Sequence, residues 1–216
     1  AVDNQGNVYV IGYSGNDYAT IKYNSEGIQQ WEQIFNGGAE DQATALALDD
    51  SGNVYVTGYI NSAYNNCGYA TIKYNPDGIQ QWIKQYEGPG GSEDKPTAIA
   101  VDSSGNVYVT GNSVGLIYHD YATIKYNSAG DTLWIRRYNG LASDQDYATA
   151  LAIDTDGNVY VTGYSTGTGS LTDCSTIKYS SAGVQQWVSR YHGPSNSYDY
   201  AFAIYVDDSG NFYIAG

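Results

Sequence analysis

A unit of about 52 residues recurs along this chain of 216 residues, and no other feature limits the fold so strongly. The string Gly-Asn-(Val/Phe)-Tyr-(Val/Ile) occurs five times, and its asparagines are Asn7, Asn53, Asn106, Asn158 and Asn211. The string Thr-Ile-Lys-Tyr occurs four times, and its lysines are Lys22, Lys73, Lys125 and Lys178. A tryptophan follows each lysine by nine residues, and these are the only four in the chain: Trp31, Trp82, Trp134 and Trp187. The chain therefore consists of four units and the start of a fifth.

Each unit reads as four short strands joined by tight turns. In the second unit, residues 53–57 alternate as a strand does, and turns with Gly52 and Gly78 precede two of the strands. No segment has a helical period. Four antiparallel strands per unit of this length are typical of a β-propeller blade. We therefore predict an all-β chain, a single β-propeller segment with four-stranded blades at approximately 1–36, 37–87, 88–139 and 140–192 and a partial blade at 193–216.

Charge excludes several classes of function. Acidic residues number 23 and basic residues nine, so the net charge is −14. A general nucleic-acid binder needs a basic face, and an anionic lipid surface would repel this chain. No apolar run approaches the roughly 20 residues that a membrane-spanning helix needs. We therefore expect neither a nucleic-acid partner nor insertion into a membrane.

The order of the recurring strings resembles a known family. The pattern D-x-x-G-N-V-Y-V-T-G, then Y-A-T-I-K-Y-N-x-x-G, then Q-Q-W resembles the bacterial SBBP-type β-propeller repeat over essentially the whole chain. The pattern is also similar in phase to NHL-type blades, which implies that residues 43–48 and their equivalents form the innermost strand and the tryptophan strand the outermost. The resemblance implies an extracellular or surface-attached bacterial protein, with the periplasm as the alternative location. It brings no catalytic residues.

Most recurring side chains have a structural interpretation. One tryptophan per blade favours a residue packed between blades, with its indole N–H bonded to backbone, over a ring of sugar-stacking platforms. We expect each repeated lysine to pair with an aspartate of its own or the next blade, and not with an anionic ligand. The aspartates expected to bond turn amides are Asp3, Asp49, Asp102, Asp154 and Asp207. The strand tyrosines expected in the core are Tyr9, Tyr55, Tyr108, Tyr160 and Tyr213.

The segments that vary between units fall at one end of the predicted propeller, opposite the Asp-x-x-Gly and Asn-x-x-Gly turns. Variable loops on a rigid scaffold commonly carry binding residues. These loops hold 11 of the 23 acids and a single lysine, Lys95, so we expect either a negative surface that suits a cation or basic partner, or a merely solvated one. The candidate ligand-binding residues are Tyr59, Tyr64, Glu93, Asp94, Tyr118, Asp120, Tyr164, Asp173, Tyr198 and Asp199.

No catalytic or metal-binding set is evident. The two histidines, His119 and His192, lie in different units, and no Ser/His/Asp or Cys/His set repeats or clusters. Cys67 and Cys174 lie in blades that are not neighbours, so we expect no disulfide. Residues 154–157 resemble part of a calcium loop but lack its remaining ligands. We expect no cofactor, with calcium as the one left open.

The chain starts at the tail of an innermost strand and stops after the second strand of a fifth blade, which we interpret as a segment of a larger propeller. Open blade edges expose unpaired strands, so we expect self-association through them. The leading hypothesis is a non-catalytic binding or scaffold module that contacts a glycan, protein or cation through its acidic, tyrosine-bearing loops. The alternatives are a propeller lyase or hydrolase with a carboxylate-bound metal at the channel mouth, and a structural component of a surface layer or filament.

Overall fold

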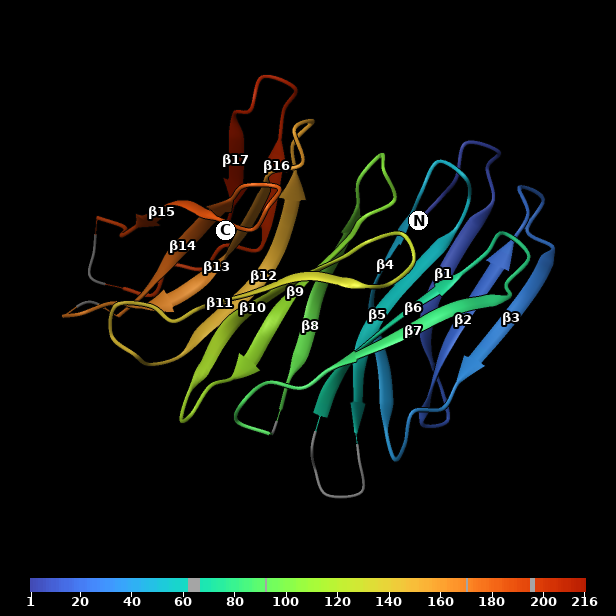
Figure 1. The fold of residues 1–216 in the computed structure, drawn as a ribbon, viewed down its shortest axis with the longest axis horizontal. Coiled ribbons are helices and arrows are strands. Elements are labelled where there is room, and N and C mark those ends of the chain that lie inside the picture. The colour runs from blue at the N-terminus through green and yellow to red at the C-terminus, as the bar shows by residue number, and fades with distance from the viewer. Residues whose placement is uncertain (62–66, 92, 170, 195–196) are drawn as a thin grey trace.

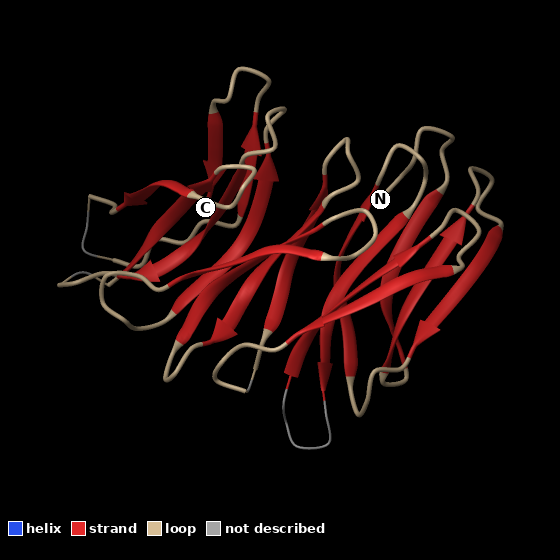
Figure 2. Ribbon diagram, in the orientation of Figure 1, coloured by secondary structure: helices blue, strands red, loops and turns tan. Residues whose placement is uncertain are grey.

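The computed structural model describes residues 1–61, 67–91, 93–169, 171–194 and 197–216, and every regular element within them is a strand (Figure 2). The first sheet contains β1 (Val8–Ser14), β2 (Asp17–Tyr23) and β3 (Gln29–Phe35). The second contains β4 (Asp41–Leu48), β5 (Val54–Asn61), β6 (Cys67–Tyr74) and β7 (Gln80–Tyr86). The third contains β8 (Lys95–Val101), β9 (Val107–Val114), β10 (His119–Tyr126) and β11 (Thr132–Tyr138). The fourth contains β12 (Asp146–Ile153), β13 (Val159–Thr166), β14 (Thr172–Tyr179) and β15 (Gln185–Tyr191), and the last contains β16 (Ala203–Val206) and β17 (Phe212–Ala215).

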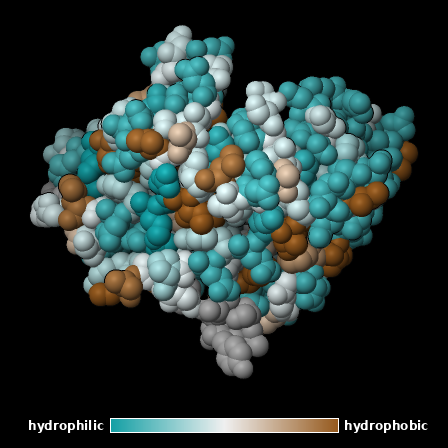
Figure 3. Space-filling model, in the orientation of Figure 1, coloured by the Kyte–Doolittle hydropathy of each residue, from teal (hydrophilic) through white to brown (hydrophobic). Residues whose placement is uncertain are grey.

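Each sheet is an antiparallel meander in sequence order, which is the topology of a propeller blade. The first strands of successive sheets, β4, β8, β12 and β16, contact one another. The tryptophan strands β3, β7, β11 and β15 lie at the other edge of the first four sheets, so the predicted β-propeller architecture is confirmed (Figure 1). Figure 3 shows several separate apolar patches on one face, and no single continuous one. In the described part of the chain no helix is long and apolar enough to cross a membrane.

A bulged threonine links neighbouring inner strands. Each of the inner strands β4, β8 and β12 pairs with the second strand of its own sheet, and this pairing skips one residue of the inner strand. The skipped residues are Thr44, Thr97 and Thr149. Their hydroxyls donate to main-chain carbonyls of the next blade, those of Pro96, Ala148 and Ala201, at 2.8, 2.9 and 2.7 Å. A bulge therefore re-aims one side chain per blade toward its neighbour.

The core lies between successive sheets, because each blade covers a face of the next. Val54, Tyr55 and Val56 in β5 are all fully buried, so neither face of this strand is open to solvent. The strand tyrosines Tyr9, Tyr55, Tyr108 and Tyr160 are buried, as predicted. Tyr213 is 56% exposed, against the prediction. It lies in the two-stranded last sheet, which no further sheet covers among the described residues.

Three of the four repeated tryptophans pack between blades and also bond to backbone, as predicted. The indole N–H groups of Trp31, Trp82 and Trp134 donate to carbonyls in the Asn turn of the next blade at 3.0, 3.2 and 3.1 Å. Gly78, in the turn that receives Trp31, has φ +80°, and a Cβ there would lie 2.8 Å from the indole ring. Glycine is therefore required in this turn both for its backbone conformation and for the close approach of the ring.

We predicted that each repeated lysine pairs with an aspartate, and three of the four do not. Lys22, Lys73 and Lys125 donate to the same turn carbonyls that the tryptophans bond, at 3.2, 3.3 and 3.0 Å. Each of these ammonium groups also lies 4.9–5.3 Å from the ring centre of a strand tyrosine. Of the four, Lys178 alone pairs with an aspartate, Asp154 in its own blade, at 3.7 Å. The prediction failed because it considered side-chain acceptors, whereas the acceptor is backbone from the next blade.

The inner-turn aspartates bond their own turns, as predicted. Asp49 Oδ1 accepts from the main-chain N–H groups of Ser51 and Asn53, and Oδ2 accepts from the Asn53 amide and the Tyr55 hydroxyl, all at 2.7–3.0 Å. Burial raises the pKa of Asp49, but these hydrogen bonds outweigh it and hold the pKa below its usual value. The same bonds recur at Asp3, Asp102, Asp154 and Asp207. Asp154 therefore makes the same turn hydrogen bonds as its four counterparts.

Candidate binding site at the loop end

The variable segments meet at the end of the propeller opposite the Asp turns. In Figure 1 the Asp turns project at the upper edge, and the connection between β7 and β8 lies at the lower edge. The main-chain N–H groups of Asp41, Asp94 and Asp199 donate to carbonyls at or beside the start of β2, β6 and β14, at 2.7, 2.9 and 2.8 Å. Three of the connections between blades are therefore bonded to the preceding blade where its second hairpin strand begins. We call this end of the molecule the loop end.

Four acids at the loop end hold the connections between blades. We call them the latch aspartates, and they are Asp41, Asp94, Asp146 and Asp199. Each accepts a hydrogen bond from the main-chain N–H of a glycine in its own connection, and these are Gly37, Gly88, Gly140 and Gly193. The sequence contained this signal, a glycine four or six residues before an aspartate. The unequal loop lengths concealed it, so Asp94 and Asp199 were predicted as ligand-binding residues.

Two arginines of the outer strands reach the loop end, which corrects the expectation of a single lysine among the acids. Arg137 Nη2 lies 2.9 Å from Asp120 Oδ2, and Arg190 Nη2 lies 3.1 Å from Asp173 Oδ2. Each guanidinium also donates to the hydroxyl and the carbonyl of one serine on the second strand of its blade. Asp120 and Asp173 are 7% and 4% exposed, so these carboxylates are paired inside the blade. Sequence spacing alone could not show that each arginine lies beside an acid 17 residues away.

A row of aromatic rings crosses the loop end from the third blade to the last sheet. It consists of His119 on β10, Tyr147 on β12, Tyr164 on β13, and Tyr200 and Tyr198 in the loop before β16. Successive ring centres are 5.0, 5.1, 4.8 and 6.1 Å apart. Tyr147 and Tyr164 are half-buried, whereas Tyr198 and Tyr200 are exposed. We call these five residues the aromatic row.

The inner-strand positions that contribute to the row differ from blade to blade. One cross-strand pair occupies them in each of the second, third and fourth blades, and in order these pairs are Gln42–Tyr59, Lys95–Asn112 and Tyr147–Tyr164. The Tyr59 hydroxyl donates to Gln42 Oε1 at 2.7 Å, and Lys95 Nζ lies 5.4 Å from the Tyr59 ring centre. Residues with a structural role are the same from one blade to the next. The residues that differ at these positions are therefore candidates for contact with a ligand or partner.

Polar groups surround the row at His119. Its Nε2 lies 3.9 Å from the Glu93 carboxylate, and its Nδ1 lies 3.3 Å from the Asn112 amide nitrogen. The side-chain oxygen of Gln145 accepts from the His119 main-chain N–H at 3.3 Å and from the Tyr147 hydroxyl at 3.1 Å. Burial lowers the pKa of His119, although Glu93 opposes this, so the imidazole is neutral at neutral pH. This part of the row can both stack on a ligand and hydrogen-bond it.

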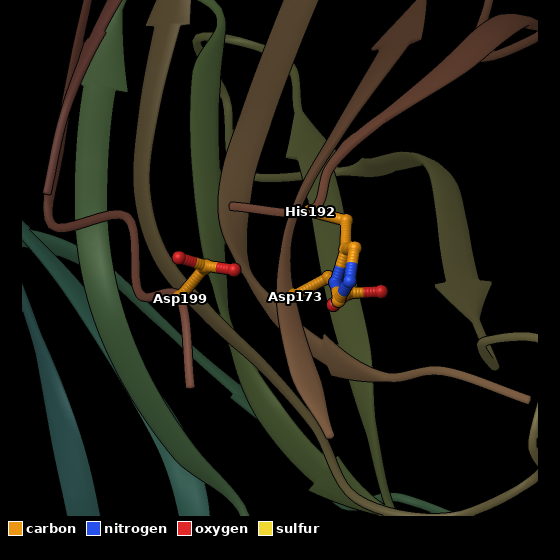
Figure 4. Close-up of side chains that lie close together, drawn as sticks. All are labelled: Asp173, His192 and Asp199. Atoms are coloured by element: carbon orange, nitrogen blue, oxygen red, sulfur yellow. The ribbon is translucent and has the colours of Figure 1, made fainter. Parts of the chain in front are cut away.

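Asp173, His192 and Asp199 come together at the boundary between the fourth blade and the last sheet, on separate segments of the chain (Figure 4). One donor atom of each lies within 4.8 Å of the others, and Asp173 Oδ1 is 3.0 Å from His192 Nδ1. This group of two aspartates and one histidine was not predicted from the sequence, which was searched for Ser/His/Asp and Cys/His sets. The three side chains lie far apart in the sequence, and only the return of the chain at β15 brings them together.

Two carboxylates and an imidazole are a donor set that divalent cations accept. Both carboxylates also have structural partners here, because Asp173 accepts from Arg190 and Asp199 accepts from the Gly193 N–H at 2.7 Å. The preceding blade has the same two acids in its Asp120–Arg137 pair and its latch Asp146, but its counterpart of His192 is Asn139. His192 is thus the one feature that distinguishes this cluster from the ordinary blade boundary.

The predicted site residues separate into distinct environments. Three are buried in hydrogen bonds or ion pairs: Asp94, Asp120 and Asp173. Six lie at the loop end with partial or full exposure: Tyr59, Glu93, Tyr118, Tyr164, Tyr198 and Asp199. Tyr64 lies outside the described residues. Sequence reasoning missed His119, Tyr147 and Tyr200 as partners of Tyr164 and Tyr198, because contacts between blades decide which rings stack.

Comparisons with known proteins agree with this architecture. The SBBP family, described as Beta-propeller repeat, matches residues 30–65, 81–118 and 133–169, together just over half of the chain. The solved structure titled "Structure of YjhT" is similar, with a TM-score of 0.51 and 15% identity over 96% of this chain and 69% of that one. A putative gluconolactonase gives a TM-score of 0.47 and 14% identity, over 94% of this chain and 65% of its own. At these identities the likeness concerns the fold alone, and no curated protein sequence matches this chain.

Proposed function

Because the chain belongs to the SBBP family of β-propeller repeat proteins, we propose that it is a non-catalytic binding module, secreted or displayed on a bacterial cell surface, whose loop end holds a glycan. The observation that carries this proposal is the aromatic row, five rings in contact across two blade boundaries. A sugar ring has an apolar C–H face and a rim of hydroxyls, and aromatic faces contact the first while amides and carboxylates bond the second. Glu93, Asn112 and Gln145 supply such polar groups beside His119.

The environment of the loop acids supports binding without catalysis. A general acid or base must reach the substrate with a free carboxyl oxygen. Asp94, Asp120 and Asp173 are buried, and each accepts hydrogen bonds from a main-chain N–H or an arginine. These three carboxylates stabilise loops and blades, so the groups offered to a ligand are the aromatic faces, the amides and the exposed carboxylate of Glu93.

A second candidate function is a propeller lyase or hydrolase that uses a bound cation, and the cluster of Asp173, His192 and Asp199 is the observation in its favour. Calcium or zinc would raise the melting temperature of the protein under this alternative, and a chelator would lower it. A structural role in a surface layer or filament instead requires ordered self-assembly through blade edges. Analytical ultracentrifugation detects self-assembly, and melting temperatures with calcium and with a chelator detect a bound cation, so the two measurements together distinguish both alternatives from a simple binding module.

The test is a titration of the protein against a panel of oligosaccharides by calorimetry. Tyr147→Ala and Tyr164→Ala should each weaken binding by about tenfold or more, as truncation of an aromatic contact at the centre of a binding surface commonly does. Tyr13→Ala is the matched control, because Tyr13 occupies the equivalent position of the first blade and has no ring of the row beside it. A panel without any bound glycan, or equal affinity in all three variants, would overturn the proposal.

A further inference from the structure

A tyrosine fills each of the first three blade boundaries. These residues are Tyr18, Tyr69 and Tyr121 at the start of the Ala-Thr-Ile-Lys-Tyr strands, and each is 1% exposed. Each ring packs edge-on against the aromatic residue that ends the neighbouring outer strand, with ring centres 5.5, 5.3 and 5.5 Å apart. The partners are Phe35, Tyr86 and Tyr138, one per blade. One T-shaped aromatic pair therefore recurs at each of these boundaries.

The hydroxyl of each of these tyrosines reaches the next blade at a glycine. A Cβ built on Gly58, Gly111 or Gly163 would lie 2.7, 2.7 or 2.9 Å from that hydroxyl, so the position has to be glycine. The Tyr69 and Tyr121 hydroxyls also donate to main-chain carbonyls of the next blade, both at 3.1 Å. The boundary thus contains a space shaped for a phenol, with a glycine at the hydroxyl end.

The fourth blade keeps this space but lacks the tyrosine. The strand that begins Tyr-Ala-Thr-Ile-Lys-Tyr in the other blades begins Cys174-Ser-Thr-Ile-Lys-Tyr here. Cys174 pairs across the sheet with Tyr191, the counterpart of Tyr86 and Tyr138. Tyr191 is 60% exposed, and no ring of the described residues packs against it. Gly216 stands at the position of Gly163, so the glycine end of the space is retained.

A cavity occupies the place of the absent ring. Its volume is about 620 Å³, and it is lined by residues that include Cys174, Tyr191, Tyr200, Phe202 and Gly216. The latch aspartate Asp199 also lines it, so one carboxylate faces a mostly apolar and aromatic space. An apolar cavity of several hundred Å³ with a single polar group is the usual form of a small-ligand site.

We propose that this cavity binds a phenolic ring, which takes the position that tyrosine occupies at the other boundaries. The bound ring packs edge-on against Tyr191, as Tyr121 packs against Tyr138, and its hydroxyl bonds within the cavity, with Asp199 as the acceptor on its lining. The bound ring covers apolar surface that is exposed because Cys174 stands where the other blades have a tyrosine. The phenol comes either from a free small molecule or from a tyrosine on another polypeptide segment. This site lies beside the proposed glycan site, and Tyr198 and Tyr200 contribute to both.

The test is a titration with p-cresol, the side chain of tyrosine as a free molecule, followed by ligand-observed NMR. The wild type should bind p-cresol with a Kd of about 1–10 mM, the affinity expected for so small a ligand. Cys174→Tyr restores the residue of the other blades and should fill the cavity, so we expect at least about tenfold weaker binding with an unchanged or higher melting temperature. Cys174→Ser keeps the space and should bind as the wild type does.

Cys174 provides a second measurement that does not depend on a variant. Saturating p-cresol should slow the labelling of Cys174 by a thiol reagent severalfold and leave the labelling of Cys67, in the second blade, unchanged. Equal binding by the wild type and Cys174→Tyr, or unprotected Cys174 at saturating p-cresol, would overturn the proposal. A tripeptide amide Gly-Tyr-Gly distinguishes the two sources. Tighter binding of the peptide than of p-cresol assigns the site to a polypeptide tyrosine, and weaker binding assigns it to a free phenol.

Discussion

The boundary between the third and fourth blades and the boundary between the fourth blade and the last sheet use the same repeated positions with different results. At the first, Tyr121 fills the space between sheets, and Trp134 and Lys125 both donate to the Ser181 carbonyl, at 3.1 and 3.0 Å. At the second, the inner-strand hydrogen bond from Thr149 to the Ala201 carbonyl remains at 2.7 Å. The links between outer strands are therefore the part of the boundary that differs.

Identical residues have other partners at the second of these boundaries, where the last sheet contains only β16 and β17. Lys178 lies beside Asp154 of its own blade, although its three counterparts donate to a turn carbonyl. Trp187 packs against Phe212 in a tilted arrangement with ring centres 5.1 Å apart, and no acceptor for its indole N–H occurs among the described residues. The role of a repeated side chain is thus set by the neighbouring blade as well as by its own strand.

The largest expected difference between the two boundaries concerns the filling tyrosine. Tyr121→Ala should lower the free energy of unfolding by about 3–5 kcal/mol, because it removes a buried ring and leaves a cavity. Tyr198→Ala at the other boundary should change it by less than about 0.5 kcal/mol, since Tyr198 is exposed. Urea unfolding followed by tryptophan fluorescence measures both. Equal losses in the two variants would mean that the tyrosine does not stabilise the boundary.

The latch aspartates give the next largest difference, and it depends on pH. Burial raises the pKa of Asp146 from 3.8 to about 6, and the hydrogen bond from Gly140 only partly opposes this. Because the folded pKa lies above the unfolded one, the contribution of Asp146 to stability is complete below about pH 4 and is lost as the pH rises through 6.

Asp146→Asn should therefore raise the free energy of unfolding at pH 7.5, by at most about 3 kcal/mol, since one pKa unit corresponds to about 1.4 kcal/mol. The gain should disappear below pH 4. Asp199→Asn, at the half-buried latch of the other boundary, is the matched control and should change stability by less than about 0.5 kcal/mol at either pH. Urea unfolding at the two pH values checks the pair. A destabilised Asp146→Asn at pH 7.5 would contradict the prediction.

Substitution of Trp134 and of Trp187 should lower the free energy of unfolding by amounts that differ by about one hydrogen bond. Trp134→Phe removes the indole N–H that bonds the Ser181 carbonyl, whereas Trp187→Phe removes an N–H that has no such acceptor. Both variants lose similar ring volume, so Trp134→Phe should cost about 1 kcal/mol more than Trp187→Phe. Thermal unfolding by circular dichroism can compare them. If Trp187→Phe costs as much, the bond to the turn carbonyl contributes nothing measurable.

The smallest effect is expected at His192. The preceding blade has Asn139 at this position, so His192→Asn should change stability by less than about 0.5 kcal/mol in the presence or absence of calcium. Melting temperatures with 5 mM calcium and with a chelator provide the measurement. A calcium-dependent rise in the wild type that His192→Asn abolishes would reverse the interpretation and favour the metal-dependent enzyme.

Recurrence in the sequence predicted the parts of the fold that act within one blade. The Asp49 turn and the buried position of Tyr55 could be predicted because their partners lie within a few residues. The direction of the tryptophan N–H was also predicted, since one tryptophan per blade has to meet the next blade. The lysine partner was not, because a main-chain carbonyl 54 residues away leaves no mark in the sequence.

The candidate sites depended more on tertiary contacts. Tyr164 and Tyr198 were predicted as ligand-binding residues, but Tyr200 lies between them in the row and joins them. Two of the latch aspartates, Asp94 and Asp199, were predicted as binding acids because the glycines of the four connections stand at unequal distances. The Tyr-to-Cys difference at Cys174 was visible in the repeat, but its consequence was not, because the cavity exists only where two sheets face each other.

The sequence by itself determined the repeating blade, its strands, its turns and the residues that pack between neighbours, because hydrogen bonds and side-chain alternation within some 50 residues specify a four-stranded meander. Tertiary structure alone decided which loop acids are buried, which rings form the aromatic row and where a cavity opens. These features arise between blades, from groups that the sequence separates by one whole repeat. Packing of one sheet on the next therefore converts nearly equal units into boundaries that differ.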